Sequence, residues 1–346
     1  MNRSRTNEPE TERQAMHHSQ QNLKNNPAVA TSKLAILALV AAAIFPAISL
    51  AQAPGQKTYP TAEAASQALF QATEQGDQNA LLEVLGPDGK EIVSSGDAAE
   101  DSANRANFAQ QYKFMHRLVA EPDGTTTLYI GAENWPTPIP LVEKDNRWHF
   151  DTATGKEEIL FRRIGKNELS AIRICQELVA AQHQFYSKEN DQYAAKFVSD
   201  KGKHDGLYWP DATDQYASPI GPLLAGAGTS AAEPKSANNT PVPFRGYYFR
   251  ILDSQGKDAA GGPINYVVDG KMTKGFAFVA YPARYRDSGV MTFIVNQEGV
   301  VYEKDLGKDT EKSAASMTSY DPGPTWQKTE DQEQEQEQSA QSQKPD

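Results

Sequence analysis

The most constraining part of this sequence is a series of short segments rich in aromatic and β-branched residues between residues 246 and 306. Such residues favour the pleated surface of a β-sheet, and turn residues separate the segments at hairpin spacing. Asp269-Gly270 and Gln297-Glu298-Gly299 are two of these turns. The pattern predicts an antiparallel sheet. Its predicted strands cover residues 246–252, 266–268, 275–282, 290–296 and 300–306.

A long amphipathic helix precedes this sheet. Asn167 is a favourable N-cap, and apolar residues recur at helical spacing from there to residue 188. The predicted buried stripe includes Leu169, Ile172, Cys175 and Val179. A long connection follows the helix, and we expect residues 218–241 to be a mobile loop because Gly, Ala, Ser and Pro are in excess there. Helix and sheet together predict a domain over residues 159–310.

An earlier stretch, residues 58–158, predicts a separate domain that begins with helices. Residues 61–75 form a predicted helix with Thr61 as its cap, and residues 78–86 form a second one. A third fits residues 101–115 with Asp101 as its cap. Predicted strands follow at residues 125–131, 137–144 and 147–152. Helices followed by a strand meander indicate an α+β fold.

Residues 34–50 form an uncharged apolar run that predicts a signal peptide. Lys24 and Lys33 precede the run, and the small-residue exit Ala51-Gln52-Ala53 follows it. We therefore expect residues 1–53 to be a signal peptide with a long polar N-terminal extension, cleaved after Ala53. The alternative is an uncleaved anchor, because the run approaches the ~17–25 residues that span a bilayer. Cleavage would leave a protein of the periplasm or extracellular space without a stable membrane span.

The charge balance and the single cysteine exclude several function classes. The net charge of -11 argues against a nucleic-acid partner, because phosphate contacts need a basic surface. One cysteine excludes a disulfide framework and a zinc site built on several thiolates, and we expect Cys175 to be a buried structural thiol. Residues 329–346 are acidic, Gln-rich and without large apolar residues, which predicts a disordered tail.

The segment KGKHDGLYWP holds the best polar and aromatic constellation for a ligand site. The His204 imidazole lies beside the Asp205 carboxylate in the chain, with Tyr208 and Trp209 close by, and such groups can act as a base or bind a ligand. The alternative is structural, because aromatic residues before a proline commonly pin a loop to the core.

A second candidate group comprises Asn134 and Trp135 together with the segment Trp148-His149-Phe150. These residues could line a pocket in the first domain. The alternative is that Trp148 and Phe150 are core residues and that His149 points outward between them. We expect no metal and no cofactor, because the histidines are scattered and no G-x-S-x-G, Walker-type or dinucleotide-binding motif occurs. We also predict no catalytic residue.

Several long segments resemble the bacterial family called domain of unknown function 2950, over about residues 58–328. The segments are ENWPTPIPLVEKDNRWHFDTATGKEEILFRRIGKNELSAI, KHDGLYWP, GYYFRIL, GFAFVAYPARY and SGVMTFIVNQEGVVYEKDLG. The resemblance implies no activity. Residues 162–194 are also similar to the exposed half of the helix in type IV pilin-like and pseudopilin proteins, although no prepilin motif leads into Arg162. Residues 60–155 resemble the cone-shaped nuclear-transport-factor-2-like folds in pattern alone.

Two functions remain open from the sequence. The first is an exported envelope protein that acts as a non-catalytic binding or assembly module, with another envelope protein as its partner. The second is a small-molecule-binding protein or hydrolase that uses a cavity of the first domain or the His204-Asp205 loop. Several polar side chains converging on a closed pocket would favour the second function, whereas an exposed aromatic patch would favour the first.

Overall fold

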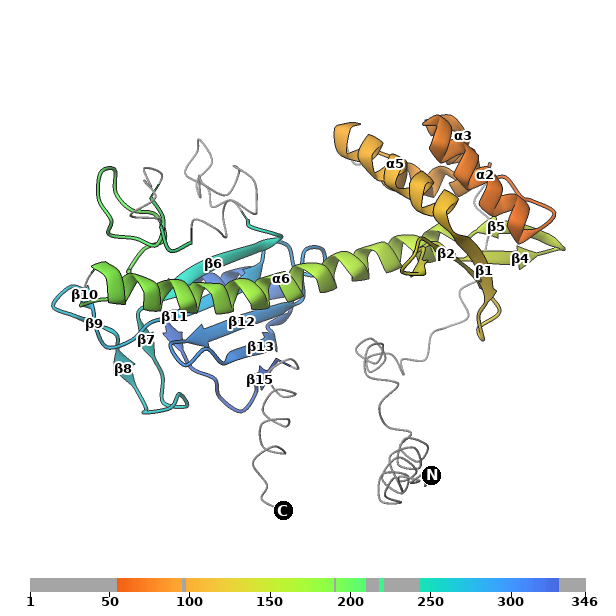
Figure 1. The fold of residues 1–346 in the computed structure, drawn as a ribbon. Helices are drawn as coiled ribbons and strands as arrows, with labels where there is room; N and C mark the ends of the chain where they lie inside the picture. Colours follow the sequence, from red (N-terminus) through yellow and green to blue (C-terminus); the bar gives the residue numbers. More distant parts are fainter. Residues whose placement is uncertain (1–54, 95–97, 190, 210–217, 221–242, 330–346) are drawn as a thin grey trace, which may run out of the picture. The chain divides into compact units, whose positions relative to one another are not determined.

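The computed structural model describes residues 55–94, 98–189, 191–209, 218–220 and 243–329 (Figure 1). The expected leader lies outside the described residues, as do most of the expected mobile loop and all but one residue of the expected tail. Residues 218–220, at the start of that expected loop, are described: Ser218 and Ile220 are buried, and the Ile220 N–H donates to the Leu207 carbonyl (3.2 Å). At the other end, Thr329 is buried and its N–H donates to the Val301 carbonyl (3.1 Å).

The first half of the described chain begins with helices. They are α2 (Ala62–Gln75), α3 (Gln78–Leu85), η1 (Pro87–Gly89), α4 (Lys90–Val93) and α5 (Ala98–Phe114). The predicted cap of α2 is confirmed, since the Thr61 hydroxyl accepts a hydrogen bond from the Ala64 N–H (3.1 Å). The predicted cap Asp101 is wrong. Because Ala98 and Ala99 are good helix formers, α5 begins before Asp101 and encloses its buried side chain.

An antiparallel sheet, the first sheet, packs on these helices. Its strands are β1 (His116–Ala120), β2 (Thr126–Ile130), β3 (Trp135–Pro136), β4 (Leu141–Lys144) and β5 (Arg147–Phe150). They are ordered β1-β2-β4-β5, and β3 pairs with β2. Asp145 and Asn146 form the two-residue turn between β4 and β5, and both have positive φ, at 52° and 57°, as a tight hairpin turn requires. The buried side chains of Leu141 and Phe150 join the sheet to α2 and α3.

A single long helix, α6 (Thr152–Glu189), follows the first sheet. The predicted start at Asn167 is wrong, because nothing between Thr152 and Asn167 breaks a helix and Asp151 already caps it. The Asp151 carboxylate accepts from the Thr154 N–H (3.1 Å). The expected domain boundary between residues 158 and 159 therefore falls inside one helix. Gly155 allows close packing here, since a Cβ would come within 2.6 Å of Ile139 Cγ1.

The second half of the chain forms a second antiparallel sheet, in the order β15-β13-β12-β11-β6. Its strands are β6 (Tyr247–Leu252), β11 (Ala277–Pro282), β12 (Met291–Asn296), β13 (Val301–Asp305) and β15 (Gln327–Lys328). Shorter elements flank it. They are β7 (Ser254–Gln255), β8 (Ile264–Asn265), β9 (Val267–Val268), β10 (Lys271–Met272), η3 (Gly307–Asp309), α8 (Thr310–Ala315) and β14 (Ser319–Tyr320).

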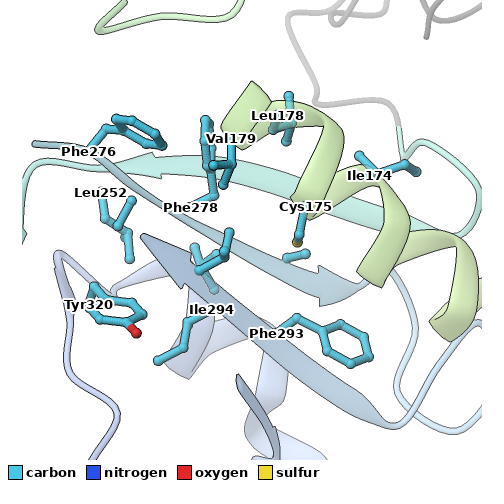
Figure 2. Close-up of a cluster of buried hydrophobic side chains, with 14 of the residues drawn as sticks. Ile174, Cys175, Leu178, Val179, Leu252, Phe276, Phe278, Phe293, Ile294 and Tyr320 are labelled. Atoms are coloured by element: carbon cyan, nitrogen blue, oxygen red, sulfur yellow. The ribbon is translucent and has the colours of Figure 1, made fainter. Parts of the chain in front are cut away.

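The larger core lies between α6 and this second sheet. Figure 2 shows Cys175 and Val179 directed from α6 toward the strands, and both belong to the buried cluster that includes Phe278 and Phe293. The other face of the sheet is covered in part by α8, which packs on β11. Leu169 departs from the predicted buried stripe, because its side chain is largely exposed.

A hydrogen-bonded clamp fixes the middle of α6 to the loop before β12. The Glu168 carboxylate accepts hydrogen bonds from the Val290 N–H (2.8 Å) and the Met291 N–H (3.0 Å). The Asn167 side chain donates to the Ser288 carbonyl (2.9 Å), and the Tyr247 hydroxyl donates to the Met291 carbonyl (3.0 Å). Asn167 is therefore part of a tertiary contact rather than a helix cap.

Replacing Cys175 tests the core. Burial raises the pKa of the Cys175 thiol to about 12, so the thiol stays protonated and unreactive. We expect Cys175→Ser to lower the free energy of unfolding by about 1–3 kcal/mol in urea denaturation, because it buries a hydroxyl. The control Cys175→Ala, which introduces no polar atom, should cost less. Complete labelling of the native thiol by a bulky maleimide would show instead that Cys175 is accessible.

Candidate functional site

The segment around His204 packs on the larger core, between α6 and the second sheet, through its aromatic residues. The His204 ring stacks on the Trp209 ring with 4.3 Å between centroids and 17° between planes. Trp209 and Leu207 are buried, and the Tyr208 N–H donates to the Phe197 carbonyl (2.8 Å). Three of the predicted site residues therefore lie on a short segment whose backbone is hydrogen-bonded to the segment around Phe197. They are His204, Tyr208 and Trp209.

The fourth of these residues, Asp205, contacts a lysine. Lys196 Nζ lies 2.9 Å from the Asp205 carboxylate and 2.8 Å from that of Asp200, and the Asp200 N–H donates to Asp205 (2.9 Å). Burial alone would raise the pKa of Asp205, but the hydrogen bonds from Lys196 and from the Asp200 backbone lower it below the usual value. The hydrogen bond from Lys196 likewise lowers the pKa of Asp200 to about 2. Both groups stay ionised near neutral pH, which suits an ion-pair network better than proton transfer.

Asn134 ends a surface turn, and Trp135 is the first residue of β3. Asn134 has a φ of 56°, and its side-chain oxygen accepts from Arg117 Nε (2.7 Å). The Trp135 side chain is 56% exposed, and the Arg162 guanidinium lies 5.4 Å from the centroid of its ring. Arg162 also donates to the Pro136 carbonyl (2.7 Å), so Trp135 is held in place by a residue of α6.

This contact forms part of a surface that we call the aromatic ledge, made of Trp135, Glu158, Phe161 and Arg162. Glu158 accepts a hydrogen bond from Arg162 Nε (2.6 Å). Residues 158, 161 and 162 share one face of α6, because positions three and four apart in a helix are neighbours. The Phe161 side chain is 62% exposed there. Phe161 was not among the predicted site residues. The available signal was its place beside the polar sequence Arg162-Arg163, outside the predicted apolar stripe.

The segment around Trp148 is partly core and partly different from the prediction. Phe150 is fully buried and Trp148 is half-buried, and both pack in the hydrophobic cluster between the first sheet and helices α2 and α3. The alternative that His149 points outward is wrong, because its side chain is only 3% exposed. Packing covers both faces of this part of the sheet. Burial lowers the pKa of His149, with Asp151 opposing the shift and Lys144 adding to it.

Some buried polar atoms of the first half lack a partner. Within the described part of the chain, His149 Nδ1, the Tyr59 hydroxyl and the Thr137 hydroxyl have no hydrogen-bond partner. The described part of the chain also contains no group of three or more His, Cys, Asp or Glu side chains that could hold a metal ion. A helix long and apolar enough to cross a membrane is likewise missing from the residues that the structure describes.

Comparison with known proteins gives a family but no activity. A family model described as a protein of unknown function, DUF2950, matches residues 56–329. Neither the curated proteins nor the solved structures contain a match to this chain. The resemblance of the second half to pilins therefore has no support from these comparisons.

The buried His149 predicts a pH-dependent stability. Its folded-state pKa lies below the usual value of 6.5, so below about pH 6.5 the unfolded chain binds a proton that the folded chain does not. We expect the free energy of unfolding to fall as the pH drops, by at most ~1.4 kcal/mol per pH unit from this group. His149→Gln should flatten the profile measured by urea denaturation. A slope in His149→Gln equal to that of the unchanged protein would contradict the assignment.

Proposed function

This chain belongs to the DUF2950 family of proteins of unknown function, and we propose that it is an exported envelope protein that acts as a non-catalytic binding or assembly module. The signal-peptide pattern of residues 1–53, with cleavage after Ala53, supports a location in the periplasm or outside the cell. The proposed partner is another envelope protein. The surface that we propose for this partner is the aromatic ledge.

The aromatic ledge is the observation that carries this proposal. Exposed Trp and Arg side chains are enriched among the residues that dominate protein interfaces. Trp135 presents its ring beside Arg162, and Phe161 is exposed on the same helix face. Arg162 is already oriented by Glu158 and by the Pro136 carbonyl. Less side-chain freedom would then be lost on binding, which favours affinity.

The fold supports a finer proposal for each half. Helices packed on the antiparallel first sheet are consistent with a cone-like domain, and α6 packed on the antiparallel second sheet is consistent with a pilin-like arrangement. We propose both likenesses at the level of architecture alone. A fold of this kind assigns no function by itself.

A second candidate function is binding or hydrolysis of a small molecule by the first half. Its support is the buried His149, whose Nδ1 has no hydrogen-bond partner among the described residues. A polar ligand would satisfy this atom. Native mass spectrometry of the purified protein would show an added mass that disappears on denaturation. The His204-Asp205 segment supports this function less well, because Asp205 is engaged by Lys196.

Export can be tested by the mass of the protein in its native envelope fraction. We expect the intact mass of a chain that begins at Pro54, because signal peptidase cleaves after a small residue such as Ala53. The control is the same chain with Ala51→Leu and Ala53→Leu, which should keep its leader. A native mass that includes residues 34–50 would show an anchored protein instead.

The partner surface can be tested by site-specific photocrosslinking in the native host. A photoreactive phenylalanine analogue at Phe161 should form an adduct with one envelope protein, because Phe161 lies in the aromatic ledge. The Trp135→Ala variant should weaken this adduct, since truncating an aromatic anchor of an interface typically lowers affinity about 30-fold. A probe at Val268, exposed on β9, is the control. Identical adducts at both positions, or none at Phe161, would contradict the proposal.

A further inference from the structure

Five exposed basic side chains gather where the middle of α6 meets two loops of the second sheet. We call this set the basic cluster. It consists of Arg163, Lys166, Arg245, Arg284 and Arg286. Hydrogen bonds join the three segments that carry it, because Asn167 donates to the Ser288 carbonyl and the Ala283 N–H donates to the Gly246 carbonyl (2.9 Å). The cluster is basic although the whole chain has a net charge of -11.

The neighbouring carboxylates leave much of this charge uncompensated. Asp287 pairs with both Arg163 and Arg284. Glu168 is occupied by the backbone N–H groups of the clamp. Asp305 accepts from the Tyr285 hydroxyl (3.1 Å) and from the Gly307 N–H (2.7 Å). Arg245, Arg286 and Lys166 have no ion-pair partner within the described residues.

Two of these arginines occupy backbone positions that suit other residues better. Arg245 and Gly246 form a two-residue hairpin loop with φ values of 48° and 81°, closed by hydrogen bonds between Phe244 and Tyr247 (2.8 and 3.0 Å). Such a loop favours Asn-Gly. Arg286 also has a positive φ, of 62°. The chain therefore places a cation at two turns where Asn would be less strained.

Each of these two arginines also lies over an aromatic ring. The Arg245 guanidinium is 5.8 Å from the Phe244 centroid, and that of Arg286 is 5.6 Å from the Tyr285 centroid. Guanidinium groups match phosphate oxygens with paired hydrogen bonds. Aromatic rings beside cations are favoured at the headgroup level of a bilayer. This combination fits a surface that carries phosphate groups.

We propose that the basic cluster docks this protein on a membrane surface that contains anionic phospholipid. The cations lie on a helix and at two separate loop tips, which suits an array of headgroups better than one bound ion. Clusters of this size commonly mediate binding to anionic lipid. The proposed export would deliver the chain across a bilayer, and so next to a membrane surface, before cleavage after Ala53. Delivery to the membrane depends on the proposed export. The basic cluster, and its test with lipid vesicles, do not depend on the aromatic ledge.

Vesicle flotation of the full chain tests this proposal. Residues 34–50 could insert into any bilayer, so the measured quantity is the ratio of the affinities for phosphatidylglycerol-containing and pure phosphatidylcholine vesicles. We expect a ratio well above one for the unchanged chain, and its decrease at high salt. The double variant Arg245→Asn with Arg286→Asn should lower the ratio about 30-fold, from the attraction that each cation contributes near an anionic surface. Its melting temperature should not fall, because Asn suits both turns.

Two further variants separate charge from other effects. Arg245→Lys with Arg286→Lys keeps the charge and should retain most of the ratio. Lys271→Gln with Lys274→Gln removes two exposed charges near β10 and should leave the ratio unchanged. An unchanged ratio in the double Asn variant, or an equal loss in this control, would overturn the proposal. Displacement by inorganic phosphate beyond that by chloride would indicate an ion site instead. Tighter binding to duplex DNA than to anionic vesicles would also overturn the lipid assignment.

Discussion

The two hydrogen bonds that the Glu168 carboxylate accepts from Val290 and Met291 position much of the second half of this protein. A bond from an N–H to a carboxylate is stronger than one between neutral groups, and this pair is partly buried. It fixes α6 against the first residue of β12, a central strand of the second sheet. The hydrogen bond from Tyr247 to Met291 adds β6 to the same point. Cys175 and Val179 can then pack on the strands (Figure 2).

The parts of the fold that depend on short-range geometry were predictable from the sequence. Asp145-Asn146 and Asp269-Gly270 have positive φ values, as expected of turn residues that tolerate them. Helix starts were less predictable. Asp101 and Asn167 both have cap-forming side chains, but Asp101 is enclosed in α5 and Asn167 donates to a distant carbonyl. A capping residue in the sequence does not show whether the preceding residues extend the helix or whether tertiary structure takes the side chain.

The same limit applies to the candidate sites. Residues that are neighbours in the sequence can contact different partners. The His204 ring stacks on Trp209, whereas the Asp205 carboxylate pairs with Lys196. The alternation of strand β5 correctly placed Phe150 in the core. It could not show that the opposite face, with His149, is covered as well. Phe161 also needed the structure, since only the contact between Arg162 and Trp135 reveals which face of α6 the surface occupies.

The continuity of α6 restricts how this chain can change in length. Arg162 donates to a carbonyl of β3, and Glu168 accepts from the loop before β12, so both contacts are made within two turns of one helix. Each added residue would rotate everything beyond it by about 100°. One inserted or deleted residue between these positions would therefore turn one of the two contacts away from its partner. The number of residues between Arg162 and Glu168 is therefore constrained by the helix itself, whereas a change of length in an exposed surface loop would disturb no such register.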